Sequence, residues 1–421
     1  MTEPTTPAPK LHAYRWVLMG GLVLCSWGML WYGFTLGVLL PDMSEDLGIG
    51  SAAKGWLSSS FFLGQVVFSL PVTALIARYP PLRAMGVAYA LAAVLIGLAV
   101  LFPSYWVQLA MRLGVAIVFV ALNPVRTMLL AGWFGRDEIP RANSVFNSGF
   151  GTVQTVGFWT SGALLGLLGG WRALMALFVV LAALGAVVWT FIARAAPPPT
   201  QPPLVAEAGA QRRSWLALFA RRDVLALCLI GVGGAGTWAT FLTFWPQVAR
   251  DEFGLSDGAT GLVLGCAAVA IIPGSLVASW ALRMAGGRLP FLLITTLAQV
   301  PTFGLFVLTG SVPLLIAVGL VQGLTWMYFP ILLSLPFEFE GFDEQDVALA
   351  TALFVVVNGA ALALGPIVAG VAGELVPMRG VLLVASAAPL LSALGALLLG
   401  REPARRQPAA ALSSGASVAA G

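Results

Sequence analysis

Residues 105–134, YWVQLAMRLGVAIVFVALNPVRTMLLAGWF, form an apolar stretch that contains two arginines, Arg112 and Arg126, and no acidic residue. A membrane-spanning helix needs about 20 predominantly apolar residues, so this stretch is long enough to cross a bilayer. A charged side chain inside a membrane is costly and usually serves a function. The stretch therefore predicts a membrane-spanning helix that carries positive charge for a purpose.

The rest of the chain has the same character. Of its 421 residues, 59% are hydrophobic and 10% are charged, whereas soluble domains carry about 25% charged residues. None of the 18 acidic residues falls inside the apolar stretches. We therefore predict an all-α integral membrane protein with twelve transmembrane helices, at residues 16–40, 55–77, 84–102, 105–133, 143–168, 173–193, 224–249, 258–282, 289–309, 312–337, 347–373 and 378–400.

The longest polar interruption divides these helices into six plus six. We predict an N-terminal half at 1–193, a cytoplasmic linker at 194–223, a C-terminal half at 224–400 and a disordered cytoplasmic tail at 401–421. The tail is rich in Ala, Ser and Gly, a composition that does not bury enough apolar surface to fold.

The two halves repeat at a nearly constant offset. Pro41 and Pro246 lie 205 residues apart, and Pro124 and Pro330 lie 206 apart. Further pairs have offsets of 205 to 208, namely Asp46 and Asp251, Gly48 and Gly254, Gly55 and Gly261, Ala142 and Ala350, Gly157 and Gly365, and Gly162 and Gly370. Internal repeats of this kind place a transport site at the interface between the halves.

The basic residues set the expected orientation. If both termini are cytoplasmic, the cytoplasmic segments hold sixteen Lys and Arg residues and the outside loops hold four. This distribution follows the positive-inside rule. We expect a multi-pass protein of the cell inner (plasma) membrane with both termini in the cytoplasm, and the net charge of +4 then indicates no nucleic-acid partner.

The fourth apolar stretch and the start of the fifth carry a recognisable pattern. An arginine, Arg112, is followed twelve residues later by Pro124, then by Trp133-Phe134 and by Arg141-Ala142. Together with the repeat, this pattern resembles the major facilitator superfamily over nearly the whole chain. The resemblance implies a fold of two pseudo-symmetric six-helix halves that alternate access by rocking, in a carrier that works as a monomer.

Other motifs place the chain within that superfamily less closely. Gly170-Trp171-Arg172 resembles members of the anion:cation symporter branch. However, Phe119 stands where that branch often has a proton-coupling glutamate, and Ala77 and Pro80 interrupt the usual signature between helices two and three. The Gly-Pro signature of drug/proton antiporters is also missing, because residues 151–162 contain no proline.

The two embedded arginines lie on one helical stripe with Asn123. Their spacing of fourteen residues separates them by roughly 21 Å along the axis. A guanidinium matches a carboxylate, phosphate or sulfonate in a bidentate manner. We expect Arg126 to hold the charge of an anionic solute, although it also lies near enough to the interface to snorkel. Arg112 contacts the solute or, alternatively, bonds a neighbouring helix.

Helical spacing also indicates residues that could line a solute cavity. Asn147 and Gln154 lie on one face of the fifth helix and line a cavity, or alternatively only bond helix to helix. Aromatic residues of helices one, seven and ten line the same cavity or face lipid, and the candidates are Trp27, Trp31, Trp238, Phe241 and Trp326.

The loop between helices ten and eleven is wholly acidic, against the trend of the cytoplasmic side. We expect either a solvated loop or an inner gate, in which its acids pair with basic residues of the other half when the carrier faces outward. The gate would comprise Glu338, Asp343, Arg78, Arg136 and Arg141.

The sequence predicts no enzyme, no cofactor and no metal site, because it has no phosphate-binding loop, no metal-ligand spacing and no pair of embedded carboxylates. We predict a secondary transporter that moves a small organic anion by alternating access. The lack of an embedded acid favours uniport or exchange over carboxylate-based proton symport. The alternatives are an exporter of amphipathic drugs or metabolites, and a transporter-like sensor or assembly protein that moves nothing.

Overall fold

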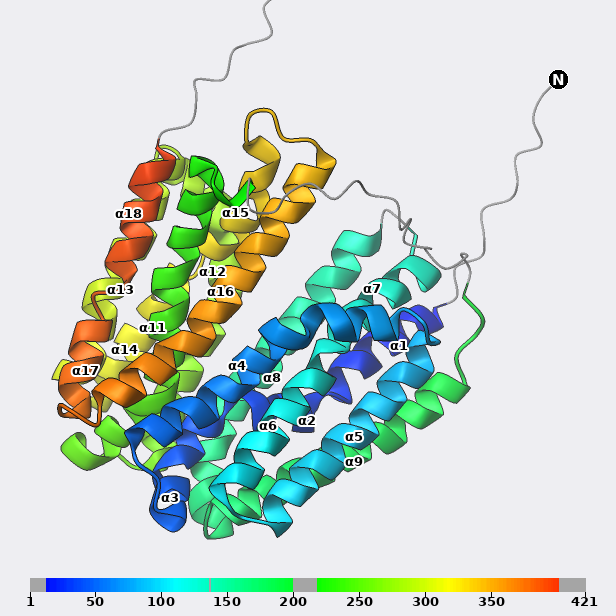
Figure 1. Cartoon of the computed structure of the whole chain (residues 1–421), viewed down its shortest axis with the longest axis horizontal. Coiled ribbons are helices and arrows are strands. Elements are labelled where there is room, and N and C mark those ends of the chain that lie inside the picture. The colour runs from blue at the N-terminus through cyan, green and yellow to red at the C-terminus, as the bar shows by residue number, and fades with distance from the viewer. Residues whose placement is uncertain (1–12, 136–137, 200–217, 401–421) are drawn as a thin grey trace, which may run out of the picture.

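The structure, a computed structural model, describes residues 13–135, 138–199 and 218–400, and the regular secondary structure in these ranges is helical. Figure 1 shows two helical bundles, which we call the N-terminal half (α1–α9) and the C-terminal half (α11–α18). The N-terminal half contains α1 (Tyr14–Leu24), α2 (Trp27–Phe34), α3 (Leu36–Leu47), α4 (Ser51–Ile76), α5 (Pro81–Leu101), α6 (Tyr105–Val120), α7 (Leu122–Trp133), α8 (Ile139–Leu168) and α9 (Trp171–Arg194). The C-terminal half contains α11 (Arg222–Phe253), α12 (Asp257–Met284), α13 (Arg288–Leu308), α14 (Val312–Thr325), α15 (Tyr328–Ser334), the 3₁₀ helix η2 (Leu335–Glu338), α16 (Glu344–Ala372), α17 (Met378–Ala385) and α18 (Pro389–Leu399).

Eleven helical passages in the described ranges are long and apolar enough to cross a membrane. The remaining passage of the expected twelve is α8, which is 30 residues long but carries amides such as Asn143, Asn147 and Gln154. The expected linker and tail fall largely on residues 200–217 and 401–421, which lie outside the described ranges.

The internal repeat is visible in the backbone. Gly48 ends α3 and Gly254 ends α11, and both adopt a left-handed conformation with φ of 60° and 63°. Glycine adopts this conformation without the steric cost that a Cβ atom brings. Pro41 lies inside α3 and Pro246 inside α11, so the matched residues have the same structural roles in the two halves.

The first passage differs from the expected single span at 16–40. It consists of α1, α2 and α3, with breaks at Cys25–Ser26 and at Thr35. Residue Thr35 has φ of −94° and ψ of 7°, outside the α-helical region. The periodicity of apolar residues could not reveal these breaks, because the stretch stays apolar across them.

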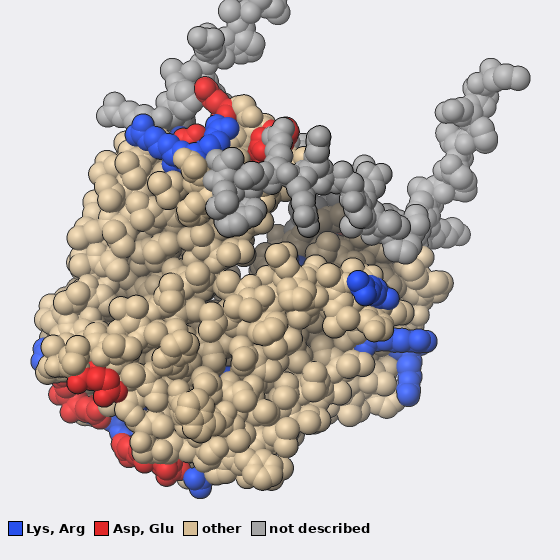
Figure 2. All heavy atoms as spheres, viewed as in Figure 1, with Lys and Arg blue, Asp and Glu red and all other residues tan. Residues whose placement is uncertain are grey.

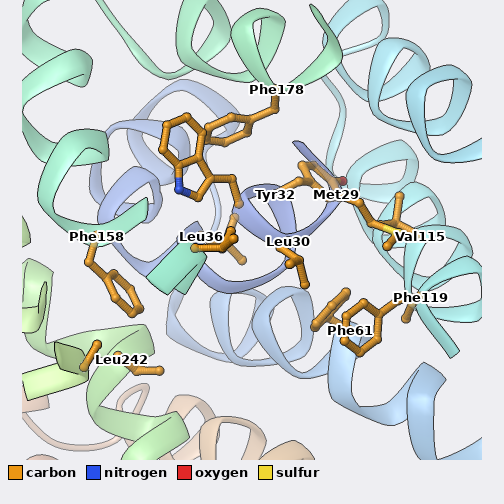
Figure 3. Packing of buried hydrophobic residues seen from close by; sticks show 14 of the residues in the cluster. Met29, Leu30, Tyr32, Leu36, Phe61, Val115, Phe119, Phe158, Phe178 and Leu242 are labelled. Atoms are coloured by element: carbon orange, nitrogen blue, oxygen red, sulfur yellow. The ribbon is translucent and has the colours of Figure 1, made fainter. Parts of the chain in front are cut away.

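The core of the N-terminal half surrounds the broken first passage. Figure 3 shows Tyr32 and Met29 of α2 directed toward α6, and Phe61 of α4 lying against Phe119 of α6. The rings of Phe61 and Phe119 have centroids 5.3 Å apart. In a bilayer, such side-chain packing contributes much of the association between helices, because lipid is as apolar as the side chains.

The two halves meet at the end of the bundle opposite the linker, which we call the far end, in contrast to the linker end. Arg250 of α11 pairs with Asp42 and with Glu45 of α3, the latter at 2.9 Å. The Lys54 ammonium of α4 donates to Gln247 Oε1 of α11 at 2.8 Å. Figure 2 shows acidic and basic side chains gathered at this end.

Glycines allow the helices of the two halves to touch there. A Cβ atom on Gly37 of α3 would overlap the backbone carbonyl of Leu242 in α11, and one on Gly55 of α4 would overlap the carbonyl of Pro366 in α16. At the linker end the two bundles diverge (Figure 1). The contacts between the halves thus describe a conformation that is closed at the far end and open at the linker end.

Candidate solute-binding site

Arg126 lies on α7, one turn after Asn123, and its guanidinium faces α8. The guanidinium carbon lies 4.7 Å from the centroid of the Phe146 ring, and Nη1 donates to Asn147 Oδ1 at 3.5 Å. The Nε atom is buried and has no hydrogen-bond partner among the described residues. None of the ion pairs in the described ranges includes Arg126, so the guanidinium keeps donors for a ligand.

The polar residues expected around Arg126 lie on the open side of the contact between the halves. Asn123 and Asn147 are exposed, and Gln154 is half-buried. Further along α8, Gly151 brings the helix close to Ile272 of α12, since a Cβ atom there would lie 3.3 Å from the isoleucine side chain. Asn147 is therefore one turn nearer the open linker end than the point where α8 reaches the other half.

Arg112 is in a different environment. Its side chain is 1% exposed, and its donors are filled by backbone carbonyls: Nε donates to Leu57 at 3.0 Å, Nη1 to Tyr32 at 2.8 Å and Nη2 to Gly33 at 3.0 Å. The guanidinium also lies over the rings of Tyr32 and Phe61. This geometry corresponds to the structural alternative, and we leave Arg112 out of the proposed solute contacts.

The five expected aromatic residues separate into two groups. Trp31 is buried against Phe178 of its own half, with centroids 5.7 Å apart, and Phe241 is buried against Phe303 at 4.6 Å. These two pack inside their halves and do not form part of an open wall.

Of the other three aromatic residues, Trp238 is buried and two keep exposed surface. Trp27 and Trp326 are half-buried, one in each half, while Trp238 packs on Trp326 with a centroid distance of 5.9 Å. The indole Nε1 atoms of Trp27 and Trp326 have no hydrogen-bond partner among the described residues. Buried indole N–H groups usually find partners, so these two atoms are candidate donors to a solute.

Sequence reasoning missed Phe146, which supports the Arg126 guanidinium. Phe146 belongs to a row of aromatic rings that continues through Phe150 to Phe34. The ring centroids of Phe146 and Phe150 are 6.4 Å apart, and those of Phe150 and Phe34 are 5.6 Å apart. The signal was available, because Phe146 and Phe150 are four residues apart and therefore on one helical face. Cation–π contact with an aromatic ring also holds a guanidinium without neutralising its charge.

For three residues of the expected inner gate, the structure shows contacts within their own half. Glu338 pairs with Arg288 of its own half at 3.2 Å. Asp343 caps α16 by accepting from the Asp346 amide at 2.8 Å. Arg141 lies over the Trp16 ring.

The other two expected gate residues are Arg78 and Arg136. Arg78 is exposed, and Arg136 lies outside the described residues. Because the linker end is open in this conformation, the gate stays a prediction about the opposite conformation.

Comparison with known proteins identifies the class. The sequence matches the Major Facilitator Superfamily over residues 17–339 and 227–420. The chain therefore belongs to this superfamily, and it is a multi-pass membrane transporter and not an enzyme.

Solved structures agree on the fold. A bacterial homologue of the human lysosomal transporter Spinster, in an inward-facing and unoccupied conformation, superimposes with a TM-score of 0.71 at 15% identity, covering 92% of this chain and 95% of that one. The nucleoside transporter NupG superimposes with a TM-score of 0.70 at 17% identity, covering 92% and 99%. At these identities the likeness shows the fold alone.

Among curated proteins, a chloramphenicol resistance protein of Streptomyces lividans is 33% identical over 234 residues, which cover 53% of this chain and 56% of that protein. An uncharacterized transporter of Schizosaccharomyces pombe is 28% identical over 99 residues, covering 24% of this chain and 20% of that protein. The chain thus spans about half of the first relative and a fifth of the second.

Proposed function

We propose that this transporter carries a small organic anion, whose charge is held by Arg126. The observation that carries the proposal is that the Arg126 guanidinium is half-buried, has an unfilled Nε donor and is paired with no carboxylate in the described ranges. A cation in this position is expensive to keep inside a membrane protein unless a ligand uses it. A carboxylate, phosphate or sulfonate would form a charge-assisted hydrogen bond with it.

The surroundings of Arg126 indicate the rest of the solute. Asn123 and Asn147 offer amide groups at the exposed side, and the aromatic row of Phe146 and Phe150 offers apolar surface. In the other half, Trp326 is half-buried, and its indole N–H has no partner among the described residues. A solute with an anionic head and a compact apolar body would match such walls, as small-molecule sites combine apolar surface with a few placed polar groups.

The mechanism would be alternating access. With the far end closed, a solute reaches Arg126 from the linker end, which we assign to the cytoplasm of a cell with this protein in its inner membrane. Rocking of the halves would then break the Arg250 and Lys54 contacts at the far end. The acidic residues of the described ranges lie toward the ends of the bundle, such as Asp42 and Asp257 at the far end and Glu138 and Glu338 at the linker end, and none of their ion pairs includes Arg126. We therefore propose uniport or exchange.

The test is ligand-dependent thermal stability of the purified protein with mono- and dicarboxylates, sugar acids, oxyanions and lipophilic cations. A ligand that binds the folded state raises its apparent stability by mass action. We expect one anion class to stabilise the protein. Arg126→Gln should weaken the binding at least tenfold, which is about 1.4 kcal/mol, without lowering the melting temperature of the ligand-free protein.

Two further variants test whether the effect is specific to the Arg126 guanidinium. Arg126→Lys keeps the charge but loses the planar fork, so it should retain part of the affinity. Arg283→Gln removes an exposed arginine of the linker end and should change nothing. Wild-type anion affinity in Arg126→Gln would refute the role of Arg126.

A second candidate is export of uncharged amphipathic compounds, which the similarity to the Streptomyces lividans chloramphenicol resistance protein favours. The half-buried Trp27 and Trp326 would contact an aromatic solute. Under this alternative, cells that express the protein would tolerate more chloramphenicol, and the tolerance would survive Arg126→Gln. Stabilisation by chloramphenicol but by no anion would replace the first candidate with this one.

A further inference from the structure

A cavity of about 850 Å³ opens at the linker end of the N-terminal half, away from the interface between the halves. It lies between the start of α5, the end of α9 and the end of α7. The segment 195–199, which leaves α9, covers one side of it. The solute-binding proposal uses none of the residues that line this cavity.

The cover over the cavity is stiff. Residues Pro197, Pro198 and Pro199 all line it, and successive prolines hold an extended backbone that lacks N–H donors. The Trp133 indole donates to the Pro197 carbonyl at 3.2 Å, which attaches the cover to the end of α7. On the other side, the buried Trp189 indole donates to the Leu82 carbonyl at 2.8 Å, which joins α9 to α5.

The polar lining of the cavity is positively charged. Arg83 and Arg194 both line it and both are exposed. No carboxylate is among the lining residues, and neither arginine belongs to an ion pair in the described ranges. Figure 2 shows basic side chains without acidic neighbours on this edge of the N-terminal half. Two guanidiniums at one opening attract a phosphate-sized anion.

The remaining lining is apolar and continues onto the membrane-facing surface. Leu82 and Val87 line the cavity, and Val87 is 68% exposed. Beyond the cavity, Leu91 of α5 and Phe191 of α9 are also exposed. Because α5 and α9 cross the membrane, this surface meets lipid acyl chains. An occupant with a negative head and an apolar tail would contact both parts of the lining.

We infer that this cavity binds an anionic phospholipid from the leaflet at the linker end. The phosphodiester lies between Arg83 and Arg194, and an acyl chain follows the apolar surface past Val87 and Leu91. A zwitterionic headgroup is disfavoured, because it brings a third cation beside the two guanidiniums. The occupant would join the end of α9 to the start of α5, and hence steady the segment that leads into the linker.

The test uses delipidated full-length protein in detergent and three soluble probes: dioctanoyl phosphatidylglycerol, dioctanoyl phosphatidylcholine and inorganic phosphate. The expected result is a rise in melting temperature with phosphatidylglycerol alone. The double variant Arg83→Gln/Arg194→Gln should lose at least tenfold in apparent affinity for this lipid. Both side chains are exposed, so the variant should fold and melt like the wild type when no lipid is added.

Two variants make the result specific. Arg283→Gln removes one exposed arginine at the linker end of the other half, outside the cavity, and should bind the lipid as the wild type does. Gly86→Leu keeps both arginines but fills the space next to Trp189, which a Cβ atom at Gly86 would approach to 3.4 Å, so it should also weaken lipid binding.

Three outcomes would overturn the inference. Equal stabilisation by phosphatidylcholine would show general lipid solvation, and equal stabilisation by phosphate would show a site for free anions. Wild-type lipid affinity in the double variant would show that the two arginines do not bind the lipid. Each outcome leaves the proposal for Arg126 untouched, because the two sites share no residue.

Discussion

The first passage of the N-terminal half and that of the C-terminal half are related by the internal repeat, yet they are built differently. The former is divided into α1, α2 and α3, whereas α11 runs without a break over 32 residues. Where α2 ends, the carbonyls of Tyr32 and Gly33 accept from Arg112. The corresponding residues of α11 lie inside an unbroken helix, so their carbonyls need no outside donor. The residue at the position of Arg112 in the repeat is Val318.

This difference explains why one embedded arginine is structural. A helix break inside a membrane leaves backbone carbonyls that need another donor, since water is absent there. Arg112 supplies three donors in a planar group, and its charge is shared among three carbonyl oxygens and two aromatic rings. Arg126 donates to the Asn147 side chain and not to carbonyls at a helix break, which is why we assign to it the contact with the solute.

The largest expected effect comes from removing the side chain that distinguishes the halves. Arg112→Leu would leave the carbonyls of Tyr32 and Gly33 without this donor, whereas the Leu57 carbonyl would still accept from the Ser60 hydroxyl. An unsatisfied buried polar group costs about 1–3 kcal/mol, so we expect the free energy of unfolding to fall by about 3 kcal/mol or more. Thermal unfolding in detergent measures it.

Two comparisons sharpen this prediction. Arg112→Lys keeps a charge but has no planar fork, and it should recover only part of the loss. Arg283→Leu removes an exposed arginine and should leave the melting temperature nearly unchanged. If Arg112→Leu melts with the wild type, the break in the first passage does not depend on this arginine.

A moderate effect is expected where the two first passages meet. Arg250 of α11 pairs with Asp42 and Glu45 of α3, so Arg250→Gln should weaken the closure of the far end. A partly exposed ion-pair network contributes up to about 1 kcal/mol, which shifts the balance between the two conformations roughly fivefold. A cysteine at Ser58, which bonds Thr243 across the interface, should then react faster with a membrane-impermeant thiol reagent.

The control for this experiment lies at the same end. Arg379 pairs with Glu252 at 3.1 Å within the C-terminal half, so Arg379→Gln should not change the labelling rate. The native cysteines Cys25, Cys228 and Cys266 would be replaced by alanine in every variant. Equal labelling in Arg250→Gln and in its parent would show that the pairs across the halves do not hold the far end closed.

The smallest effect is expected at Gln299, a buried amide of the C-terminal half. Gln299 is fully buried, and its amide nitrogen has no hydrogen-bond partner among the described residues. Replacing such a group by an apolar side chain of similar shape is nearly neutral. Gln299→Met should therefore change the free energy of unfolding by less than about 1 kcal/mol. A loss as large as that of Arg112→Leu would show that Gln299 stabilises its half as much as Arg112 stabilises the other.

Some parts of the site were predictable and others were not. Helical spacing predicted that Asn123 shares a stripe with Arg126 and that Asn147 shares a face with Gln154, and in the structure Asn147 accepts from Arg126 at 3.5 Å. The expected wall of aromatic residues was only partly recovered, because Trp31 and Phe241 pack inside their own halves. Periodicity identifies the face of a helix but does not tell whether that face meets a cavity or a neighbouring helix.

The sequence by itself determined the membrane class, the division into halves, the superfamily and the presence of two embedded arginines. These follow from local composition, from the internal offset and from a contiguous motif, each of which is written along the chain. Only the tertiary structure decided which arginine is free, because that depends on carbonyls 55 to 80 residues away from Arg112. It likewise decided that Arg250 joins the halves and that Arg83 and Arg194 share one cavity, since distant helix ends meet only after the bundle has packed.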